Sequence, residues 1–321
     1  MPRLGVLGTL VWDTIHGPDG GDVVEDWGGV AYCLAAWSAV APPGWSLVPV
    51  IKVGADLSES AGQFLGTVGG ISSLEFVRSV PEANNRVSLF YHDQSRRCEK
   101  LTGGVPGWTA AEIERVALSC DALYVNFISG WELDLEAAHA LGTRFEGPTW
   151  CDVHSLILGV GDGGMREPRP LRDRAAWLEA FDVVQVNEDE IEMLSPAGVG
   201  GSRADRMRGL LADGPGAVFL TRGSAGAEWV IRPDARWPEP KGGATAGSAP
   251  VEKTAPPGAT DPTGCGDVWG ITCFASLLAG AGAAEAVRKA NHLAAATAAR
   301  QGTTGLSERL MEVARAADSE R

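Results

Sequence analysis

The sequence predicts an α/β protein with a doubly wound, mostly parallel sheet and helices on both faces. From residue 110 onward, short apolar runs alternate with amphipathic segments, and strands that alternate with helices imply parallel βαβ units. The composition agrees, because a chain of 321 residues that is 45% hydrophobic and 21% charged can bury a large core. We expect one domain over residues 1–321 with a small appendage.

The first part of the chain predicts two strands, one helix and a hairpin. Residues 4–10 form a short apolar run broken by glycines, typical of a buried strand. Gly28 and Gly29 precede VAYCLAAWSAVA, a helix of small residues, and SLVPVIKVG reads as the next strand. The runs 86–91 and 97–101 flank a polar turn and predict a hairpin.

The rest of the chain carries the alternation itself. Helices are predicted at 110–119, 133–141, 173–180 and 203–212, and the strands that follow them are ALYVNFI, PTWCDV, DVVQV and GAVFLTRG. Residues 232–260 are rich in Pro, Gly and Ala, which predicts a loose excursion with a short strand near Val251. SERLMEVARAADSER predicts a terminal helix.

Charge and cysteine content exclude several classes of function. A net charge of -14 argues against nucleic acid or an anionic membrane as the main partner. The six cysteines are widely spread and form no Cys-x-x-Cys pair, so we expect neither a zinc site nor a disulfide framework, and a cytoplasmic setting. The N-terminal apolar run is too short for a membrane span and lacks a small-residue cleavage site.

The stretch DPTGCGD, residues 261–267, is the best candidate for a phosphate site. It precedes the apolar segment VWGITCFASLLAG, which predicts a helix starting near Asp267. Helix N-termini carry unpaired amides and partial positive charge, and glycines let those amides converge on an anion. The amides of Gly264, Cys265 and Gly266 are therefore predicted to form an anion hole. Asp267 is either a general base beside it or only a helix-start carboxylate.

Other phosphate signatures are weak. No Gly-x-x-x-x-Gly-Lys-Ser/Thr sequence is present, which excludes a P-loop. The segment 159–164 matches Gly-x-Gly-x-x-Gly but leads into MREPRP, which cannot start a long helix. We expect a loop there, and an unrelated Rossmann-type binder is the alternative.

Several motifs, in order, resemble the ribokinase / PfkB family of sugar and nucleoside kinases. DPTGCGD is similar to the family's Asp-Thr-x-Gly-Ala-Gly-Asp signature, with Pro262 and Cys265 as departures. GTLVWD, GGVAYCLAA, KVGADLSES, VNEDE and TRGSAG resemble further family motifs along nearly the whole chain. The resemblance implies a ribokinase-like fold with a β lid, formed by about 14–27 and 84–103, and an ATP- and Mg²⁺-dependent kinase.

The resemblance also assigns roles to individual positions. It makes Asp267 the general base, and the 264–266 amides the stabilisers of the transferring phosphoryl group. The acceptor would be bound by Asp13, Gly28, Gly29 and Cys33. The nucleotide would be bound by Asn187, Thr221, Gly223 and Asp261. Glu190, with Asn187, would hold Mg²⁺ through water, although Asn187 and Glu190 also suit a helix-capping pair.

Departures from the family pattern bear on the acceptor. Cys33 stands where the family commonly has Asn, and Ile128 lies near where ribokinases place a Glu. No cluster of Arg and Lys accompanies the predicted pocket, with Arg86 and Arg97 of the hairpin as the exceptions. A neutral polyol, sugar or nucleoside is therefore favoured over a sugar phosphate.

Alternatives and partners follow from the same motifs. The rivals are a nucleoside kinase of the inosine, guanosine or adenosine type and a catalytically idle homologue that binds a sugar or nucleotide. The expected partners are ATP and a small hydroxyl acceptor, without nucleic acid or membrane. The resemblance also allows a homodimer through the lid and a K⁺ site of carbonyls near Asp261 and residues 301–305.

Overall fold

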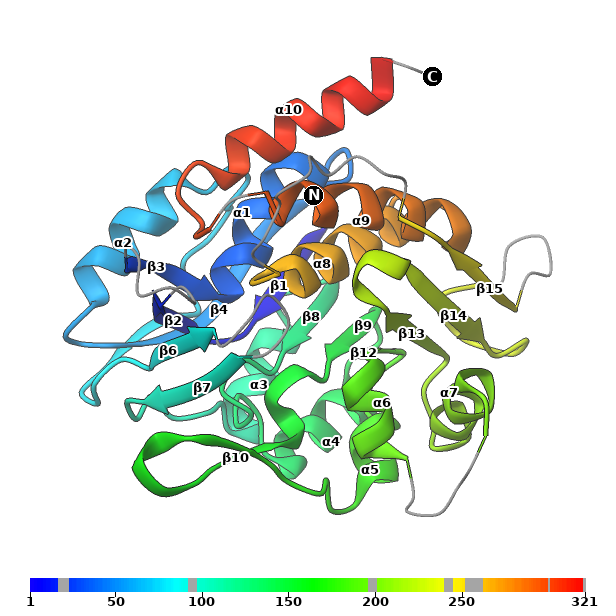
Figure 1. Ribbon diagram of the computed structural model, residues 1–321, viewed down its shortest axis with the longest axis horizontal. Helices are drawn as coiled ribbons and strands as arrows, with labels where there is room; N and C mark the ends of the chain where they lie inside the picture. Colours follow the sequence, from blue (N-terminus) through cyan, green and yellow to red (C-terminus); the bar gives the residue numbers. More distant parts are fainter. Residues whose placement is uncertain are drawn as a thin grey trace.

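The protein is built around a nine-stranded sheet (Figure 1). The computed structural model describes residues 1–16, 23–91, 97–195, 201–239, 245–251, 262–299 and 301–319. The strand order is β15 (Ala246–Ala249), β14 (Ala227–Ile231), β13 (Ala217–Thr221), β12 (Val183–Asn187), β9 (Thr149–Asp152), β8 (Ala122–Asn126), β1 (Arg3–Leu7), β4 (Ser46–Gly54), β5 (Val77–Val80). Neighbours are parallel except for the antiparallel pairs β13–β14 and β14–β15, which confirms the predicted fold class.

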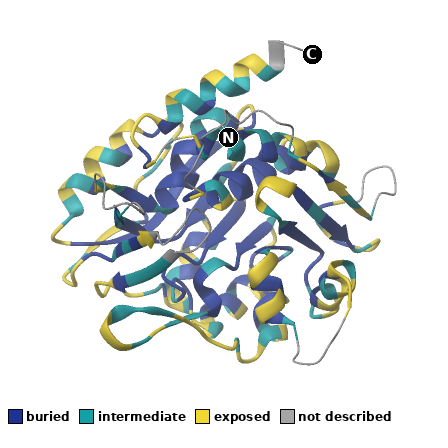
Figure 2. Cartoon of the chain, in the orientation of Figure 1, coloured by how far each residue is buried: buried dark blue, intermediate teal, exposed yellow. Residues whose placement is uncertain are grey.

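Helices cover both faces of this sheet. One face packs against α1 (Val30–Val40), α2 (Ser58–Thr67), α8 (Cys265–Leu278), α9 (Ala283–Thr297) and α10 (Leu306–Ser319). The other packs against α3 (Ala110–Ala117), α4 (Leu135–Arg144), α5 (Arg174–Leu178), α6 (Glu188–Leu194) and α7 (Arg203–Ala212). The result is a three-layer sandwich with its buried residues along the sheet (Figure 2).

Burial on both faces explains the continuous apolar runs of the strands. Successive strand side chains point to opposite faces, and β13 is an example. Ala217 and Phe219 join the core on the α8 side, whereas Val218 and Leu220 join the core on the α7 side. A strand covered by helices on both sides therefore shows no polar alternation.

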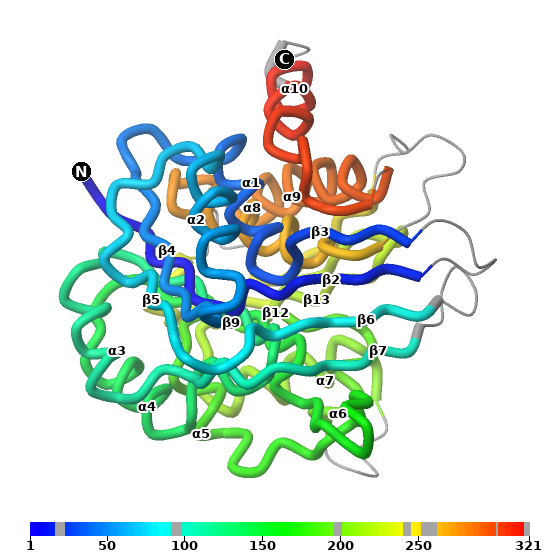
Figure 3. Tube along the Cα trace, turned by 90° about the vertical axis from the view of Figure 1, so that its left-hand side faces the viewer, coloured from blue at the N-terminus to red at the C-terminus, as the bar shows by residue number. Residues whose placement is uncertain are grey.

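A second, four-stranded sheet stands beside the main one and is called the side sheet below. Its order is β3 (Val24–Gly29), β2 (Leu10–His16), β6 (Arg86–Tyr91), β7 (Arg97–Thr102), and its strands run side by side in Figure 3. The β6–β7 pair is the predicted hairpin. The side sheet includes most of the predicted lid segments, although it starts earlier, at Leu10. Residues 17–22 and 92–96 of the predicted lid lie outside the described residues.

Three local predictions differ from the structure. The single strand expected at 4–10 is two strands, because the chain leaves the main sheet at Gly8, where a Cβ would come within 2.9 Å of the Val30 side chain. The Pro-, Gly- and Ala-rich segment carries its short strand at Ala246–Ala249, before Val251, and β14 precedes it. Thr221 and Ala227 are paired, so tertiary pairing made a strand where the local pattern had indicated none.

The Gly-x-Gly-x-x-Gly match is a small hairpin. It comprises β10 (Leu158–Val160), η2 (Asp162–Gly164) and β11 (Arg166–Pro168), and β10 pairs antiparallel with β11. No long helix follows the glycines, so this segment lacks the strand–turn–helix context of a dinucleotide site. Among the helices that the structure describes, none is long and apolar enough to span a membrane.

The two-sided core predicts where truncation will destabilise the protein. Leu123 in β8 is 1% exposed, whereas Leu118, just after α3, is 88% exposed. Leu123→Ala should lower the free energy of unfolding by about 2–5 kcal/mol, because it removes buried methyl groups and leaves a cavity. Leu118→Ala is the matched control and should change it by less than about 0.5 kcal/mol. Urea unfolding of both variants measures this, and equal losses would contradict the burial pattern.

Candidate active site

The Gly-rich turn forms as predicted and leads directly into α8. Gly264 precedes the helix with φ +77°, a left-handed conformation that favours glycine. A Cβ at Gly264 would also come within 2.1 Å of the Tyr32 ring. Cys265 directs its thiol toward the carbonyl oxygen of Ala294 in α9, at 3.4 Å. The turn therefore presents backbone at the helix start, while Asp261 lies outside the described residues.

Asp267 lies in the first turn of α8 and is hydrogen-bonded to the end of a strand of the main sheet. The Asn126 side chain, at the end of β8, donates a hydrogen bond from Nδ2 to Asp267 Oδ1 at 2.5 Å. The Cys33 thiol lies 3.5 Å from the Asp267 carbonyl oxygen and 3.5 Å from Asn126 Nδ2. All three residues are buried. Cys33 thus sits beneath the turn and supports it, and burial together with nearby Asp267 raises its pKa.

A second carboxylate, Asp152 at the end of β9, lies in the same region. Gln185 Nε2 donates to Asp152 Oδ2 at 3.0 Å and to the Gly266 carbonyl oxygen at 3.1 Å. Burial, reinforced by the charges of Glu190 and Asp267, raises the pKa of Asp152 well above its usual value. Three acids from different parts of the chain therefore meet at one buried edge of the sheet.

Asn126, Asp152 and Gln185 were not among the predicted site residues. Each is a polar residue in or at the end of an otherwise apolar strand: ALYVN, TWCD and VVQVN. That interruption is a usable signal, because ligands of open α/β sheets bind beyond the carboxyl ends of the strands. His154 lies two residues after Asp152. Its φ is +34°, an unusual conformation for a residue other than glycine.

Asn187 and Glu190 form the helix-capping pair that the sequence allowed. Asn187 Oδ1 accepts from the Glu190 amide at 2.9 Å, and Glu190 Oε2 accepts from the Asn187 amide at 2.8 Å. Burial, with added repulsion from Asp189 and Asp267, raises the pKa of Glu190 to about 8, against the lowering effect of the Asn187 amide. A buried acid that ionises only with difficulty at neutral pH gains from a nearby cation.

The acids suit a hydrated magnesium ion better than a fully protein-coordinated metal. Within the described residues, no three His, Cys, Asp or Glu side chains are grouped so that they could hold a metal ion. Mg²⁺ keeps several of its waters and needs only one or two carboxylates. Burial, together with the charges of neighbouring acids, raises the pKa of Asp152 and of Glu190, and a hydrated cation would offset both effects.

The predicted nucleotide residues lie along the same edge. Thr221 ends β13 and is paired in register with Asn187 at the end of β12. Thr221 Oγ1 lies 3.5 Å from the Val186 carbonyl oxygen. Gly223 has φ +50°, and a Cβ built on it would meet no atom within 4 Å. The chain thus turns away from the sheet here without a side chain filling the space.

Three of the four predicted acceptor residues, Asp13, Gly28 and Gly29, gather where the side sheet meets α1, whereas Cys33 lies beneath the Gly-rich turn. Asp13 in β2 is buried, and a Cβ on Gly28 in β3 would come within 1.8 Å of its carboxylate. Gly29 has φ +61°, and its Cβ would come within 2.7 Å of both Ile128 and the Thr9 carbonyl oxygen. Neither position has room for a side chain, because neighbouring atoms lie too close to the backbone. Asp13 and the start of α1 are brought together as a result.

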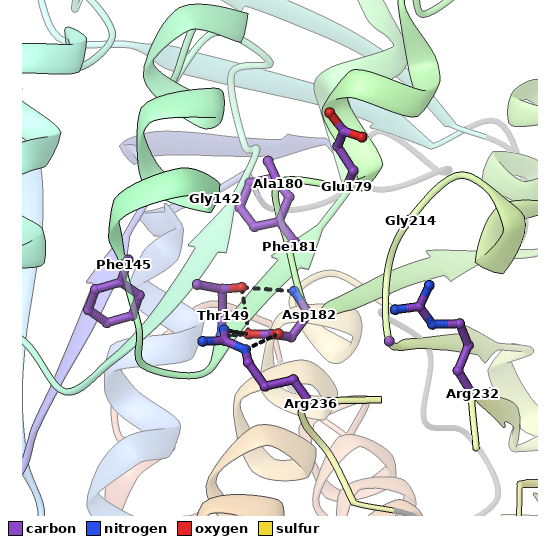
Figure 4. A pocket seen from close by; sticks show the side chains of 11 residues that line it. Gly142, Phe145, Thr149, Glu179, Ala180, Phe181, Asp182, Gly214, Arg232 and Arg236 are labelled. Atoms are coloured by element: carbon purple, nitrogen blue, oxygen red, sulfur yellow. Dashed lines mark hydrogen bonds and ion pairs between the residues drawn. The ribbon is translucent and has the colours of Figure 1, made fainter. Parts of the chain in front are cut away.

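A separate cavity of about 200 Å³ lies at the opposite edge of the sheet (Figure 4). It is lined by residues that precede β9, β12 and β13, including Asp182 and Gly216, and by Arg232 and Arg236. Arg236 donates to Asp182 and to the carbonyl oxygen of Gly147. Since the candidate acids lie at the other ends of these strands, this cavity is not part of the candidate active site.

Comparison with protein-family models gives a match over part of the chain. Residues 160–309 match the model of the pfkB family carbohydrate kinases. This region contains the Gly-rich turn, Asn187, Glu190 and Thr221. A search of the curated proteins finds no match.

Solved structures with the same fold extend the comparison over the whole chain. A protein of E. coli described as a candidate ribokinase II, in complex with ATP and Mg²⁺, is 17% identical with a TM-score of 0.72, covering 99% of this chain and 100% of that one. An Arabidopsis thaliana ribokinase complexed with ribose and ATP is 17% identical with a TM-score of 0.70, covering 98% and 99%. A pyrophosphate-dependent myo-inositol-1 kinase, converted by mutation into a myo-inositol-3 kinase, is 16% identical with a TM-score of 0.73, covering 98% and 99%.

These comparisons confirm the resemblance to the ribokinase / PfkB family and the ribokinase-like fold. At these identities the solved structures show the fold alone. Together with the family match, they support a phosphotransferase that acts on a sugar or another small molecule.

Substitutions at two glycines of the turn distinguish its role in stability from a role in phosphate binding. Gly264→Ala should unfold the turn, because the new Cβ meets Tyr32 and φ is positive. Gly266→Ala meets no atom within 4 Å, so it should leave stability unchanged or raise it by up to about 1 kcal/mol. If phosphate binds at this turn, Gly266→Ala should nevertheless impair phosphate or nucleotide binding.

Thermal unfolding and calorimetric titration of both variants with ATP test this pair. Normal nucleotide binding by a stable Gly266→Ala protein would place the phosphates elsewhere.

Proposed function

We propose that the protein is a kinase that transfers the γ-phosphoryl group of ATP to a hydroxyl of a sugar or sugar-like molecule, with Asp267 as general base. The observation that carries this is the position of Asp267. It lies in the first turn of α8, beside the backbone of a glycine-rich turn, with its carboxylate oriented by Asn126 at 2.5 Å. A carboxylate next to a helix N-terminus suits phosphorylation of a hydroxyl, because a proton acceptor then lies beside a place where backbone amides can bind phosphate.

The proposed step is an in-line displacement. The hydroxyl proton of the acceptor passes to Asp267, the hydroxyl oxygen bonds to the γ-phosphorus, and the bond from that phosphorus to the bridging oxygen breaks to release ADP. The amides of Gly264 and Gly266 would stabilise charge on the transferring group. The Cys265 amide, which donates to the Pro262 carbonyl oxygen at 3.1 Å, would join them only by giving up that bond. Asn126 keeps the carboxylate in one orientation throughout.

Magnesium would be held by Glu190 and Asp152 through water, where it would neutralise phosphate charge. Binding of the ion at neutral pH would be accompanied by loss of a proton from this acid pair, because their pKa values are raised in its absence. Thr221, Gly223 and Asn187 would contact the nucleotide along the ends of β12 and β13.

The acceptor would bind between the main sheet and the side sheet. Asp13 would accept hydrogen bonds from its hydroxyls, and the backbone at Gly28 and Gly29 would approach it closely. The side sheet would then act as the lid that excludes water. A homodimer through this sheet and a K⁺ site near Asp261 and residues 301–305 remain proposals from the family resemblance.

Other functions are kept as alternatives. A nucleoside kinase would bind inosine, guanosine or adenosine but not ribose, and an idle homologue would bind ligand without turnover. Because some proteins of this fold are pyrophosphate-dependent, pyrophosphate belongs beside ATP in every assay as a second phosphoryl donor.

The role of Asp267 predicts a loss of turnover without a loss of fold. Asp267→Asn should reduce kcat by about 10²–10⁴-fold, because Asn cannot accept the proton but can still accept the hydrogen bond from Asn126. Coupled ADP release against a panel of sugars, polyols and nucleosides measures this. Glu285→Gln, a first-turn acid of the neighbouring helix α9, is the control for a simple helix-dipole effect.

Near-normal turnover of Asp267→Asn, with an unchanged melting temperature, would remove Asp267 from this role.

The role of Glu190 predicts a change in metal dependence. Glu190→Gln and Asp152→Asn should each raise the Mg²⁺ concentration needed for half-maximal rate by about 10- to 100-fold. Glu192→Gln is the matched control, since Glu192 is an exposed acid of the same helix that pairs with Arg206. Mg²⁺ titrations at saturating ATP decide the matter. An unchanged requirement in both site variants would show that the ion is held elsewhere.

A further inference from the structure

Arg166 is a buried cation whose hydrogen-bonding groups are only partly used. It begins β11, and its side chain is 2% exposed. Its Nη2 lies 3.4 Å from the Ser155 carbonyl oxygen, and its Nε lies 3.7 Å from Glu99 Oε1, too far for a hydrogen bond. Nε and Nη1 of Arg166, and the hydroxyl of Ser155, find no hydrogen-bond partner among the described residues. Burying such groups unpaired is unfavourable, which indicates a missing partner.

The Arg166 side chain lies close to the segment that leaves β8 beside the candidate site. A Cβ on Gly130 would come within 3.4 Å of Arg166 Nη2. The Ser155 amide donates to the Phe127 carbonyl oxygen at 2.8 Å, and Phe127 follows Asn126, which holds Asp267. The unpaired groups therefore lie at the carboxyl edge of the main sheet and not on the outer surface.

Glu99 faces the same side of the side sheet as Asp13. In the register of this sheet, Glu99 on β7 pairs with Leu89 on β6, which pairs with Ile15 on β2, two residues after Asp13. Paired residues project from the same face, and so do residues two apart on one strand. Asp13 and Glu99 lie two strands apart across the sheet and two residues apart along the strand direction. The Cα atoms of Asp13 and Glu99 are therefore about 12 Å apart.

The side chains between these two acids are apolar and buried. They are Val11, Ile15, Val87, Leu89 and Leu101, with Ile128 packed against them. A molecule that bound along this cluster would meet polar groups at its two ends, Asp13 at one and the group of Arg166, Glu99 and Ser155 at the other.

We propose that Arg166, Glu99 and Ser155 form an acceptor subsite that recognises adjacent hydroxyls of a neutral polyol or sugar. This rests on the proposed kinase function and names the class of its acceptor. A hydroxyl both donates and accepts hydrogen bonds, so its oxygen takes the free N–H groups of Arg166 while its neighbour donates to Glu99. Asp13 then holds the other end of the same molecule.

The charges around Arg166 select a neutral acceptor. Glu99 and Glu132 face it from the side sheet and from the loop after β8, and Arg169 is the other cation nearby. Glu132 is committed to Thr9 and to the amides of Ser129 and Gly130. A carboxylate or phosphate on the acceptor would approach Glu99 as well as Arg166, and like charges at close range repel.

A purely structural role for Arg166 is the competing explanation. The β10–β11 hairpin lies beside β7, as Met165 bridges to Lys100 (Figure 1). In that case the Arg166–Glu99 ion pair would only stabilise the packing of the hairpin against the side sheet. Kinetics can separate the two roles, because loss of a purely structural contact would change the KM of every acceptor alike.

The experiment measures ADP release with Mg-ATP as the donor and orthophosphate release with Mg-pyrophosphate as the donor. The neutral probes are myo-inositol, ribose and sorbitol, and the anionic probes are gluconate, glucuronate and ribose 5-phosphate. Wild-type protein should favour a neutral probe. Arg166→Gln and Glu99→Gln should each raise the KM for that probe by about 10- to 100-fold, with the KM for the phosphoryl donor and the melting temperature unchanged.

Two controls make the result specific. Arg172→Gln, an exposed arginine of the same segment, should leave all constants unchanged. Deoxy analogues of the best probe, each lacking one hydroxyl, identify the contact. For the analogue without the recognised hydroxyl, the penalty of Arg166→Gln should fall to less than about threefold.

Three results would overturn the inference: a preferred acceptor that is anionic, an unchanged KM in both variants, or the same penalty for every deoxy analogue. If no probe is phosphorylated, the kinase proposal itself fails, and calorimetric titration of the neutral probes decides the subsite. Binding to wild-type protein that is lost in Arg166→Gln would still support the subsite, and no binding of any neutral probe would refute it.

Discussion

The hydrogen bond between Asn126 and Asp267 is the interaction on which the candidate site depends. It joins the end of a central strand to the first turn of α8, across 141 residues of sequence, and both partners are buried. Because the carboxylate is oriented by the sheet, α8 and the Gly-rich turn are positioned against the strand ends. Asp152, Gln185 and Glu190 then occupy the neighbouring positions.

Three acids at one buried edge of the sheet lose hydration and repel one another, and hydrogen bonds offset this unfavourable free energy only in part. Asn126 and Gln185 each donate to one carboxylate, and the backbone of Asn187 donates to Glu190. The pKa values of Asp152 and Glu190 nevertheless stay raised, since desolvation and repulsion from neighbouring acids outweigh these bonds. This edge of the sheet therefore favours positive charge. A cation bound with a nucleotide would reduce the repulsion among the three acids.

Helix α1 connects the two halves of the proposed reaction. Gly29, just before its first residue, lets the chain pass Ile128 on the acceptor side. Tyr32 and Cys33, one turn later, pack beneath Gly264 and Asp267 on the phosphate side. In the proposed reaction, one rigid element would therefore determine the spacing of the acceptor and the phosphoryl group, which suits a reaction that depends on positioning.

Local sequence determined much of this protein. The parallel sheet could be predicted because strands such as ALYVN are buried on both faces and so remain apolar throughout. The turn before α8 and the Asn187–Glu190 cap could be predicted because both arise from contacts within a few residues. Only tertiary structure decided that Asn126, Asp152 and Gln185 meet Asp267, that residues 4–10 divide between two sheets, and that Arg166 lies near Glu99. Those outcomes depend on strand order and register, which bring distant residues together and which no local pattern of side chains encodes.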